Sequence, residues 1–217
     1  MLENLKKQVV KVAQQADVSG LCKHKSGNFS IKDKDTNYVV VTPSGVARED
    51  LTYHDICVVD LEANVVEIET DVRPTSELLM HLEAYKARPD INAIVHTHSH
   101  FATAFAVLAK PIPPIVYEVL CYGGHVPVAS YGRPGTMALA KSVVEPLQSS
   151  DAVLLEAHGV LTVGEDIESA LLKANYVEDT AEIYYRSLLL NGGKEPNILP
   201  LEELQNWQYP DQINLNK

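Results

Sequence analysis

Residues 91–100 read INAIVHTHSH, an apolar run that ends in alternating histidines. The apolar part predicts a buried strand over 91–98, followed by a helix from Ser99 to Leu108. Residues i and i+2 of a strand face the same side of a sheet, with Cα atoms roughly 7 Å apart. The side chains of His96 and His98 are therefore close enough to bind one metal ion.

A second apolar segment, AVLLEAHG (152–159), predicts another buried strand, which ends at His158. Three imidazoles at the ends of two core strands form a site with an open coordination position, the layout of catalytic rather than structural zinc. His100 is a weaker candidate ligand, because it lies where the helix begins. The remaining histidines lack such a pattern and are expected to be ordinary: His24, His54, His81 and His125.

The rest of the chain mixes strands and helices without a strict alternation. Short turns join neighbouring strands, as between Ile56 and Glu69, which favours a mixed, largely antiparallel sheet flanked by helices over a doubly wound parallel fold. No phosphate loop of a nucleotide-binding fold is present. Further helices are predicted over 2–18, 76–88 (with Thr75 or Ser76 as N-cap), 136–148 and 167–191. Further strands are predicted directly after the turn Ser26-Gly27-Asn28, at 38–41, at two places within 56–69 and at 126–130.

The length of 217 residues fits a single domain, 1–217. A net charge of −11 argues against binding to nucleic acid or to an anionic membrane. Three cysteines without a CxxC pair, Cys22, Cys57 and Cys121, predict a reducing, cytoplasmic location. The N-terminal segment is charged and amphipathic, unlike a signal peptide, and no apolar run is long enough to span a membrane.

Three turns combine small hydroxyl residues with backbone N–H groups: Ser26-Gly27-Asn28, Thr42-Pro43-Ser44-Gly45 and Pro74-Thr75-Ser76. Each could bind an anion, and the third also precedes a helix N-terminus. Glu77, at the start of the same helix, is a candidate general base, although a carboxylate there is also typical of helix capping.

In this order and spacing, SGNFS (26–30), TPSG (42–45), RPTSE (73–77), HTHSH (96–100) and AHG (157–159) resemble the class II aldolase/adducin family. The resemblance implies a three-layer α/β sandwich and a homotetramer with sites at subunit interfaces. It also implies a lyase of carbohydrate metabolism, which cleaves a ketose 1-phosphate such as L-fuculose 1-phosphate. The products would be dihydroxyacetone phosphate and a short hydroxyaldehyde such as L-lactaldehyde.

The same resemblance assigns roles to individual residues. Zinc, with manganese or cobalt as alternatives, would be held by His96, His98, His158 and Glu77, and Glu77 would also move the proton at C3. Tyr117 would act on the aldehyde oxygen, and Tyr209 would match a tail residue that closes over the site. The substrate phosphate would be bound by Gly27, Asn28, Ser44, Gly45, Thr75 and Ser76.

Other activities on this fold stay open. L-ribulose-5-phosphate 4-epimerase is the main alternative, but the epimerases have Asp where Glu77 stands and a longer segment between the HTH and HG motifs. A sugar-phosphate dehydratase is a minor alternative. The non-catalytic adducin branch is disfavoured because it lacks the metal ligands that are present here.

Overall fold

The computed structural model describes residues 1–206, so the predicted tail residue Tyr209 lies outside the described part of the chain. Its centre is one eight-stranded sheet with the order β4-β3-β2-β1-β5-β8-β7-β6. All neighbouring strands are antiparallel except the β6–β7 pair, which confirms the predicted mixed, largely antiparallel sheet. The strands are β1 (Asn28–Lys32), β2 (Val39–Val41), β3 (Cys57–Val59), β4 (Val65–Glu67), β5 (Ala93–Thr97), β6 (Val128–Ala129), β7 (Ala152–Leu155) and β8 (Gly159–Gly164).

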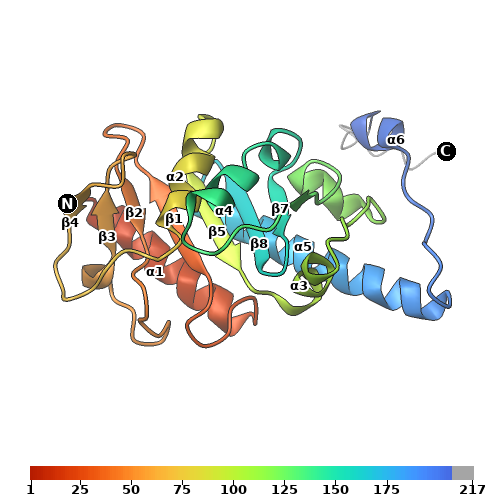
Figure 1. Ribbon diagram of the computed structural model, residues 1–217, viewed down its shortest axis with the longest axis horizontal. Coiled ribbons are helices and arrows are strands. Elements are labelled where there is room, and N and C mark those ends of the chain that lie inside the picture. The colour runs from red at the N-terminus through yellow and green to blue at the C-terminus, as the bar shows by residue number, and fades with distance from the viewer. Residues whose placement is uncertain (207–217) are drawn as a thin grey trace, which may run out of the picture.

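Helices cover both faces of the sheet, which makes the predicted three-layer sandwich (Figure 1). One core lies between the sheet and the pair α2 and α4, and a second between the sheet and the pair α1 and α5. A third core joins α3 and the 3₁₀ segment η2 to β7, β8 and α5. The α-helices are α1 (Glu3–Val18), α2 (Leu78–Ala87), α3 (His100–Val107), α4 (Met137–Ser142), α5 (Ile167–Leu190) and α6 (Leu201–Asn206), and the 3₁₀ segments are η1 (Tyr53–Asp55), η2 (Tyr117–Tyr122) and η3 (Pro146–Gln148).

Successive side chains of a strand point to opposite faces of the sheet, so each strand contributes side chains to two cores. Val39, Val41 and Val59 face α2 and α4, whereas Val40 and Val58 face α1. Successive strand residues point to opposite faces, so a continuous apolar run such as 39–41 is buried on both sides. No described helix has the length and apolar character needed to cross a membrane.

The segment after the predicted strand 152–159 differs from expectation. β7 ends at Leu155, residues 156–158 form a turn, and the unpredicted strand β8 begins at Gly159. The turn is closed by a bond from the His158 N–H to the Leu155 carbonyl (2.9 Å), and Ala157 has a left-handed φ of 56°. His158 therefore stands in a tight hairpin turn and not at the end of a strand.

Two helix boundaries also differ. The helix predicted over 136–148 ends at Ser142, because Pro146 lacks the N–H that would bond the Ser142 carbonyl in a continuing helix. The predicted N-caps of α2 are wrong as well: Glu77 itself is the N-cap, and Thr75 Oγ1 accepts a bond from the Glu77 N–H (3.3 Å).

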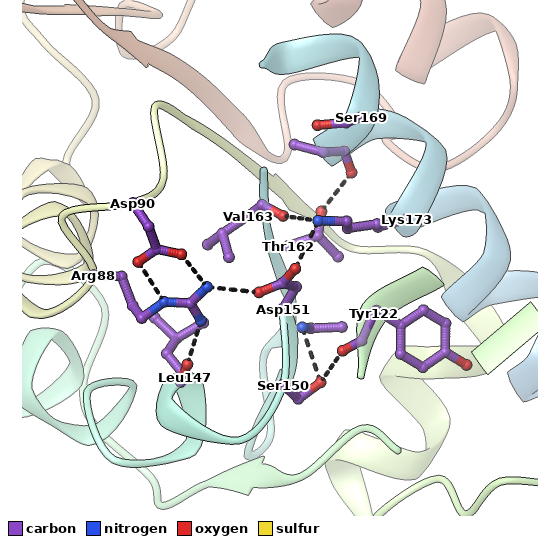
Figure 2. A network of polar contacts seen from close by, with 12 residues as sticks. Arg88, Asp90, Tyr122, Leu147, Ser150, Asp151, Thr162, Val163, Ser169 and Lys173 are labelled. Atoms are coloured by element: carbon purple, nitrogen blue, oxygen red, sulfur yellow. Dashed lines mark hydrogen bonds and ion pairs between the residues drawn. The ribbon is translucent and has the colours of Figure 1, made fainter. Parts of the chain in front are cut away.

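A polar network ties the end of α2 to the strands and to α5 (Figure 2). Asp151 accepts from Arg88 (3.0 Å) and from Lys173 (2.7 Å), which also donates to the Val163 carbonyl (3.0 Å). Arg88 makes a two-pronged contact with Asp90 (2.6 and 2.8 Å). The two helices on opposite faces of the sheet are thus joined through one carboxylate.

Candidate metal and active site

Four of the predicted site residues meet at one place. Ligand atoms of Glu77, His96, His98 and His158 all lie within 4.8 Å of one another. The Nε2 atoms of His96 and His98 are 3.0 Å apart. The two Glu77 oxygens lie 3.1 Å from His96 Nε2 and 3.1 Å from His158 Nε2.

The sheet brings these residues together from three parts of the chain. His96 lies on β5, paired with Asn28 of β1 on one side and with Leu161 of β8 on the other. His98 follows the end of β5, and His158 immediately precedes β8, which pairs antiparallel with β5. The Nδ1–H of His96 donates to the Val160 carbonyl (2.8 Å), which leaves its Nε2 facing the cluster.

Two glycines allow this close packing around His96. A Cβ added at Gly27 would lie 2.6 Å from the His96 carbonyl oxygen, and Gly27 has a φ of +77°. A Cβ added at Gly159 would lie 2.4 Å from the Thr97 carbonyl oxygen and 3.1 Å from the His98 ring. The glycines of the SGN and HG motifs are therefore required by backbone approach to the histidines.

The electrostatics of the cluster favour a bound cation. Burial alone would raise the pKa of the Glu77 carboxyl, but the neighbouring His96 and His158 imidazoles outweigh it and lower the pKa. Burial, followed by repulsion from His96 and His158, lowers the pKa of His98 to about 3. Glu77 is thus an anion and His98 a neutral imidazole at neutral pH, the forms that bind metals.

The residues fit the metal that the sequence implies. Oε1 of Glu77 is buried and has no hydrogen bond of good geometry from the described residues, although His158 Nε2 lies 3.1 Å away. A buried carboxylate oxygen without a donor is costly, and a cation would satisfy it. Three imidazoles with one carboxylate suit zinc, and also several other divalent ions.

The three turns predicted to bind phosphate adjoin one another through Thr42, the buried first residue of the second turn. Its N–H donates to the Phe29 carbonyl (3.0 Å), and its own carbonyl accepts from the Thr75 N–H (3.0 Å). The Ser44 N–H also donates to the Arg73 carbonyl (2.8 Å), and Pro43 pairs with Pro74. Ser44, Gly45, Thr75 and Ser76 therefore lie on two turns joined side by side, next to the strand that begins after Gly27.

Other predicted residues are placed differently. The Asn28 side chain lies inside the protein, where Nδ2 donates to Glu77 (2.7 Å) and Oδ1 contacts His81 (2.5 Å). Tyr117 is 43% exposed on η2, and its hydroxyl donates to Glu203 of α6 (3.1 Å). His100 is exposed at the start of α3 and is not part of the cluster.

Two buried residues near the site have roles that the sequence did not reveal. His81, expected to be ordinary, is fully buried and contacts Asn28. Arg48 is 2% exposed and donates to the carbonyls of Ser26 (3.3 Å) and Gly27, so it holds the SGN turn. A helical i+4 spacing from Glu77 to His81 was the only local signal for the first of these, and none existed for Arg48.

Comparison with known proteins agrees with this geometry. The model of the family described as Class II Aldolase and Adducin N-terminal domain matches residues 7–185. The chain belongs to the class II aldolase/adducin family. Its relatives carry aldolase names, so this family member is an enzyme for which lyase activity is expected.

Three similar proteins illustrate the range within this aldolase family. A 5-deoxy-D-ribulose 1-phosphate aldolase of Bacillus thuringiensis is 34% identical over 206 residues, covering 95% of this chain and 94% of the relative. A 5-methylthioribulose-1-phosphate/5-deoxyribulose-1-phosphate aldolase of Rhodospirillum rubrum is 34% identical over 198 residues, covering 91% and 86%. A solved structure of an L-fuculose 1-phosphate aldolase superposes with a TM-score of 0.87 at 36% identity, covering 93% of each chain.

Proposed function

We propose that this enzyme cleaves a ketose 1-phosphate by a metal-dependent retro-aldol reaction, which yields dihydroxyacetone phosphate and a short hydroxyaldehyde. The observation that carries the proposal is the position of Glu77, 3.1 Å from the Nε2 atoms of both His96 and His158. The same carboxylate follows directly after the turn of Thr75 and Ser76. A base, a metal site and a candidate phosphate site thus adjoin one another.

Each group has a role in this reaction. His96, His98, His158 and Glu77 would hold the metal, which supplies Lewis-acid polarisation of the substrate carbonyl when bound. The turns at Ser44–Gly45 and Thr75–Ser76 would bind the phosphate through their hydroxyls and through the N–H groups of Gly45 and Ser76, because the N–H groups of Ser44 and Thr75 already bond to backbone carbonyls. Gly27 would add its N–H group from the neighbouring turn. The Asn28 side chain has partners in Glu77 and His81, so its predicted phosphate contact is not part of this proposal.

The proton transfers balance between two positions of the sugar. Cleavage of the C3–C4 bond requires loss of the C4 hydroxyl proton and leaves an electron pair on C3, which then takes up a proton. We assign the C3 proton to Glu77 and the aldehyde oxygen to Tyr117. In the direction of C3–C4 bond formation, the Glu77 carboxylate takes the C3 proton of dihydroxyacetone phosphate and the Tyr117 hydroxyl gives its proton to the aldehyde oxygen. Cleavage reverses both transfers, and a proton that passes from Tyr117 to Glu77 through solvent restores the starting forms.

The substrate we favour is L-fuculose 1-phosphate or a similar ketose 1-phosphate. The related aldolases are named for fuculose, deoxyribulose and methylthioribulose phosphates, which share the 1-phosphate of a ketose. Zinc is the metal we favour, with manganese or cobalt as alternatives, and we place the enzyme in the cytoplasm. The negative net charge is no obstacle, because the proposed phosphate site uses backbone N–H groups and not a lysine cluster.

We also infer a homotetramer with active sites at subunit interfaces. α5 carries several apolar side chains that remain exposed in the single chain. Burial of such residues between subunits is favourable. Native mass spectrometry would show four chains, whereas a monomer active at full rate would contradict the assembly. The exposed apolar residues of α5 are Leu172, Ile183, Tyr185, Leu189 and Leu190.

The decisive experiment assays the zinc-loaded protein with each ketose 1-phosphate. Release of dihydroxyacetone phosphate from L-fuculose 1-phosphate or 5-deoxyribulose 1-phosphate is expected. Conversion of L-ribulose 5-phosphate to D-xylulose 5-phosphate without cleavage would instead establish the epimerase, and loss of water would establish a dehydratase.

Replacement of Glu77 should stop the proton transfer at saturating zinc. In Glu77→Gln, the amide cannot take up or deliver the proton, so kcat should fall by about 10²-fold or more. Proton exchange at C3 of dihydroxyacetone phosphate, followed by NMR in deuterated water, should stop as well. Unchanged exchange in a folded Glu77→Gln protein would remove Glu77 from the mechanism.

A further inference from the structure

A chain of buried polar groups leads from the candidate metal centre into the core between the sheet and α2. Asn28 bonds to Glu77 (2.7 Å) and to Nε2 of His81 (2.5 Å). Nδ1 of His81 contacts the Ser30 hydroxyl (2.7 Å), which contacts the Tyr85 hydroxyl (2.8 Å). The members alternate between β1, which supplies Asn28 and Ser30, and α2.

The carboxylate at one end sets the direction of every bond in this chain. An ionised carboxylate only accepts, so the Asn28 amide nitrogen must face Glu77 and its oxygen must face His81. That oxygen accepts, so the Nε2 of His81 must carry the proton. In a neutral imidazole Nδ1 is then an acceptor, and it must receive the proton of the Ser30 hydroxyl. Ser30 in turn accepts from Tyr85, whose proton faces the Ser30 oxygen at 2.8 Å in preference to the Asn92 carbonyl at 3.5 Å.

Burial keeps the side chains that follow Glu77 in this chain of hydrogen bonds uncharged. The side chains of His81 and Ser30 have no solvent exposure, and Tyr85 has 2%. Burial lowers the pKa of His81 to about 3, with repulsion from His96 adding to the shift. Burial likewise raises the pKa of Tyr85 above its usual range. The chain therefore works through fixed dipoles and not through a charge of its own.

We propose that His81 is a positioning residue, which as the Nε2–H tautomer holds the Asn28 amide so that its nitrogen points at Glu77 and fixes the carboxylate toward the histidines. The inference rests on the proposed role of Glu77 at the metal site. Without a donor at Nε2 of His81, the Asn28 oxygen loses its partner and only the bond to Glu77 orients the amide. The Glu77 carboxylate is then held less firmly toward the histidines. Outer-shell bonds of this kind affect metal affinity by about 10- to 100-fold.

The first test reads the tautomer directly and needs neither metal nor substrate. Long-range ¹H–¹⁵N correlation spectra of the metal-free chain, with ¹⁵N-labelled histidine, distinguish a protonated Nε2 from a protonated Nδ1. The expected result is the neutral Nε2–H form for His81, assigned by loss of its signals in His81→Gln. A dominant Nδ1–H form would overturn the proposal, whatever the activity of the enzyme.

The second test compares two substitutions at the same position. His81→Gln keeps an amide donor near the place of Nε2, whereas His81→Leu keeps apolar volume and removes the donor. Zinc titration of the metal-free chains should show affinity near the parent value for His81→Gln and about tenfold or greater weakening for His81→Leu. Equal zinc affinities of the two variants would show that His81 acts only by packing and would overturn the proposal.

A third variant guards against a misfolded His81→Leu protein. Ser30→Ala disturbs the same buried site but leaves the bond from Nε2–H of His81 to Asn28 in place, so the Nε2–H tautomer and the zinc affinity should stay near the parent values. A loss of zinc affinity in Ser30→Ala as large as that in His81→Leu would show that disturbed packing and not the lost donor is responsible, and would overturn the proposal. If the tautomer spectra and the zinc affinities agree with these expectations but the protein has no aldolase activity, the proposed function is refuted and the role of His81 stands.

Discussion

At the scale of single residues, the candidate site depends on how closely the backbone approaches the histidines. Gly159 follows His158 directly, and the space beside its Cα is occupied by the Thr97 carbonyl and the His98 ring. The preceding Ala157 has a left-handed φ of 56°, an uncommon conformation for a residue with a Cβ. Strain of this kind is often found where a turn presents a functional side chain.

Substitution of Gly159 tests this packing. A methyl group in Gly159→Ala would lie 2.4 Å from the Thr97 carbonyl oxygen, so β5 and the turn of His158 must separate. We expect zinc affinity to fall and thermal stability to drop, as measured by zinc titration and differential scanning calorimetry. Gly20→Ala is the control, since its Cβ meets nothing within 4 Å and it adds only the strain of φ +80°. Equal zinc affinity in both variants would contradict the packing argument.

At the scale of elements, helices are joined to the sheet by partly buried ion pairs at two places. Asp151 at the start of β7 links Arg88 after α2 with Lys173 of α5 (Figure 2). At the other end of the sheet, Lys6 of α1 is 1% exposed and pairs with Glu67 and with Glu69 (2.5 Å). Loss of its carboxylate partners would leave the buried Lys6 cation unpaired, which is costly.

The Lys6 pairs predict an acid-sensitive step in stability. The bond from Lys6, followed by that from His54, lowers the pKa of Glu69 to about 2, and the bond from Lys6 also lowers that of Glu67. A lowered pKa in the folded state means that the unfolded chain binds more protons, so this stability is present above about pH 4.5 and is lost as the pH falls toward 2. The free energy of unfolding in urea should therefore fall between pH 5 and pH 3.

A pair of lysine variants separates this step from general acid effects. Lys6→Met removes the buried cation, so the fall between pH 5 and pH 3 should be smaller than in the parent chain. Lys7→Met is the matched control on the same helix, because its pair with Glu3 is more than half exposed and contributes little. A pH dependence that is the same in all three proteins would refute the argument.

At the scale of the whole molecule, the candidate metal site lies at the middle of the sheet and connects its two halves. β5 pairs with β1 on one side and β8 on the other, the three histidine ligands lie on or next to β5 and β8, and Glu77 is the N-cap of α2. A cation bound there would contact four residues that are up to 81 positions apart in the chain, from Glu77 to His158. Binding to the folded state alone stabilises that state by mass action.

Metal removal should therefore lower the melting temperature. Zinc at 100 times its dissociation constant adds about 2.7 kcal/mol, which corresponds to roughly 5 to 11 °C for a chain of this size. Differential scanning fluorimetry with zinc and with a chelator measures the shift. His96→Ala is the reference, since it should melt at one temperature under both conditions. An unchanged melting temperature of the parent chain in the presence of the chelator would contradict the proposed metal site.

The sequence by itself determined the elements of the site and of the fold that depend on neighbouring residues. The alternation of His96 and His98 follows from the two-residue period of a strand, and the order of short strands and turns indicated a largely antiparallel sheet. The family motifs then extended these local patterns to a shared metal site, whose four residues the structure brings together.

Only the tertiary structure decided the contacts between segments distant along the chain. β8 was missed because the predicted strand ran through the turn of Ala157, whose left-handed backbone no periodicity reveals. The roles of Thr42, Arg48 and His81 depend on which strands and helices become neighbours, and that order arises from burial of both sheet faces at once. A histidine without a motif thus came to lie behind the Glu77 carboxylate, because α2 packs over β1.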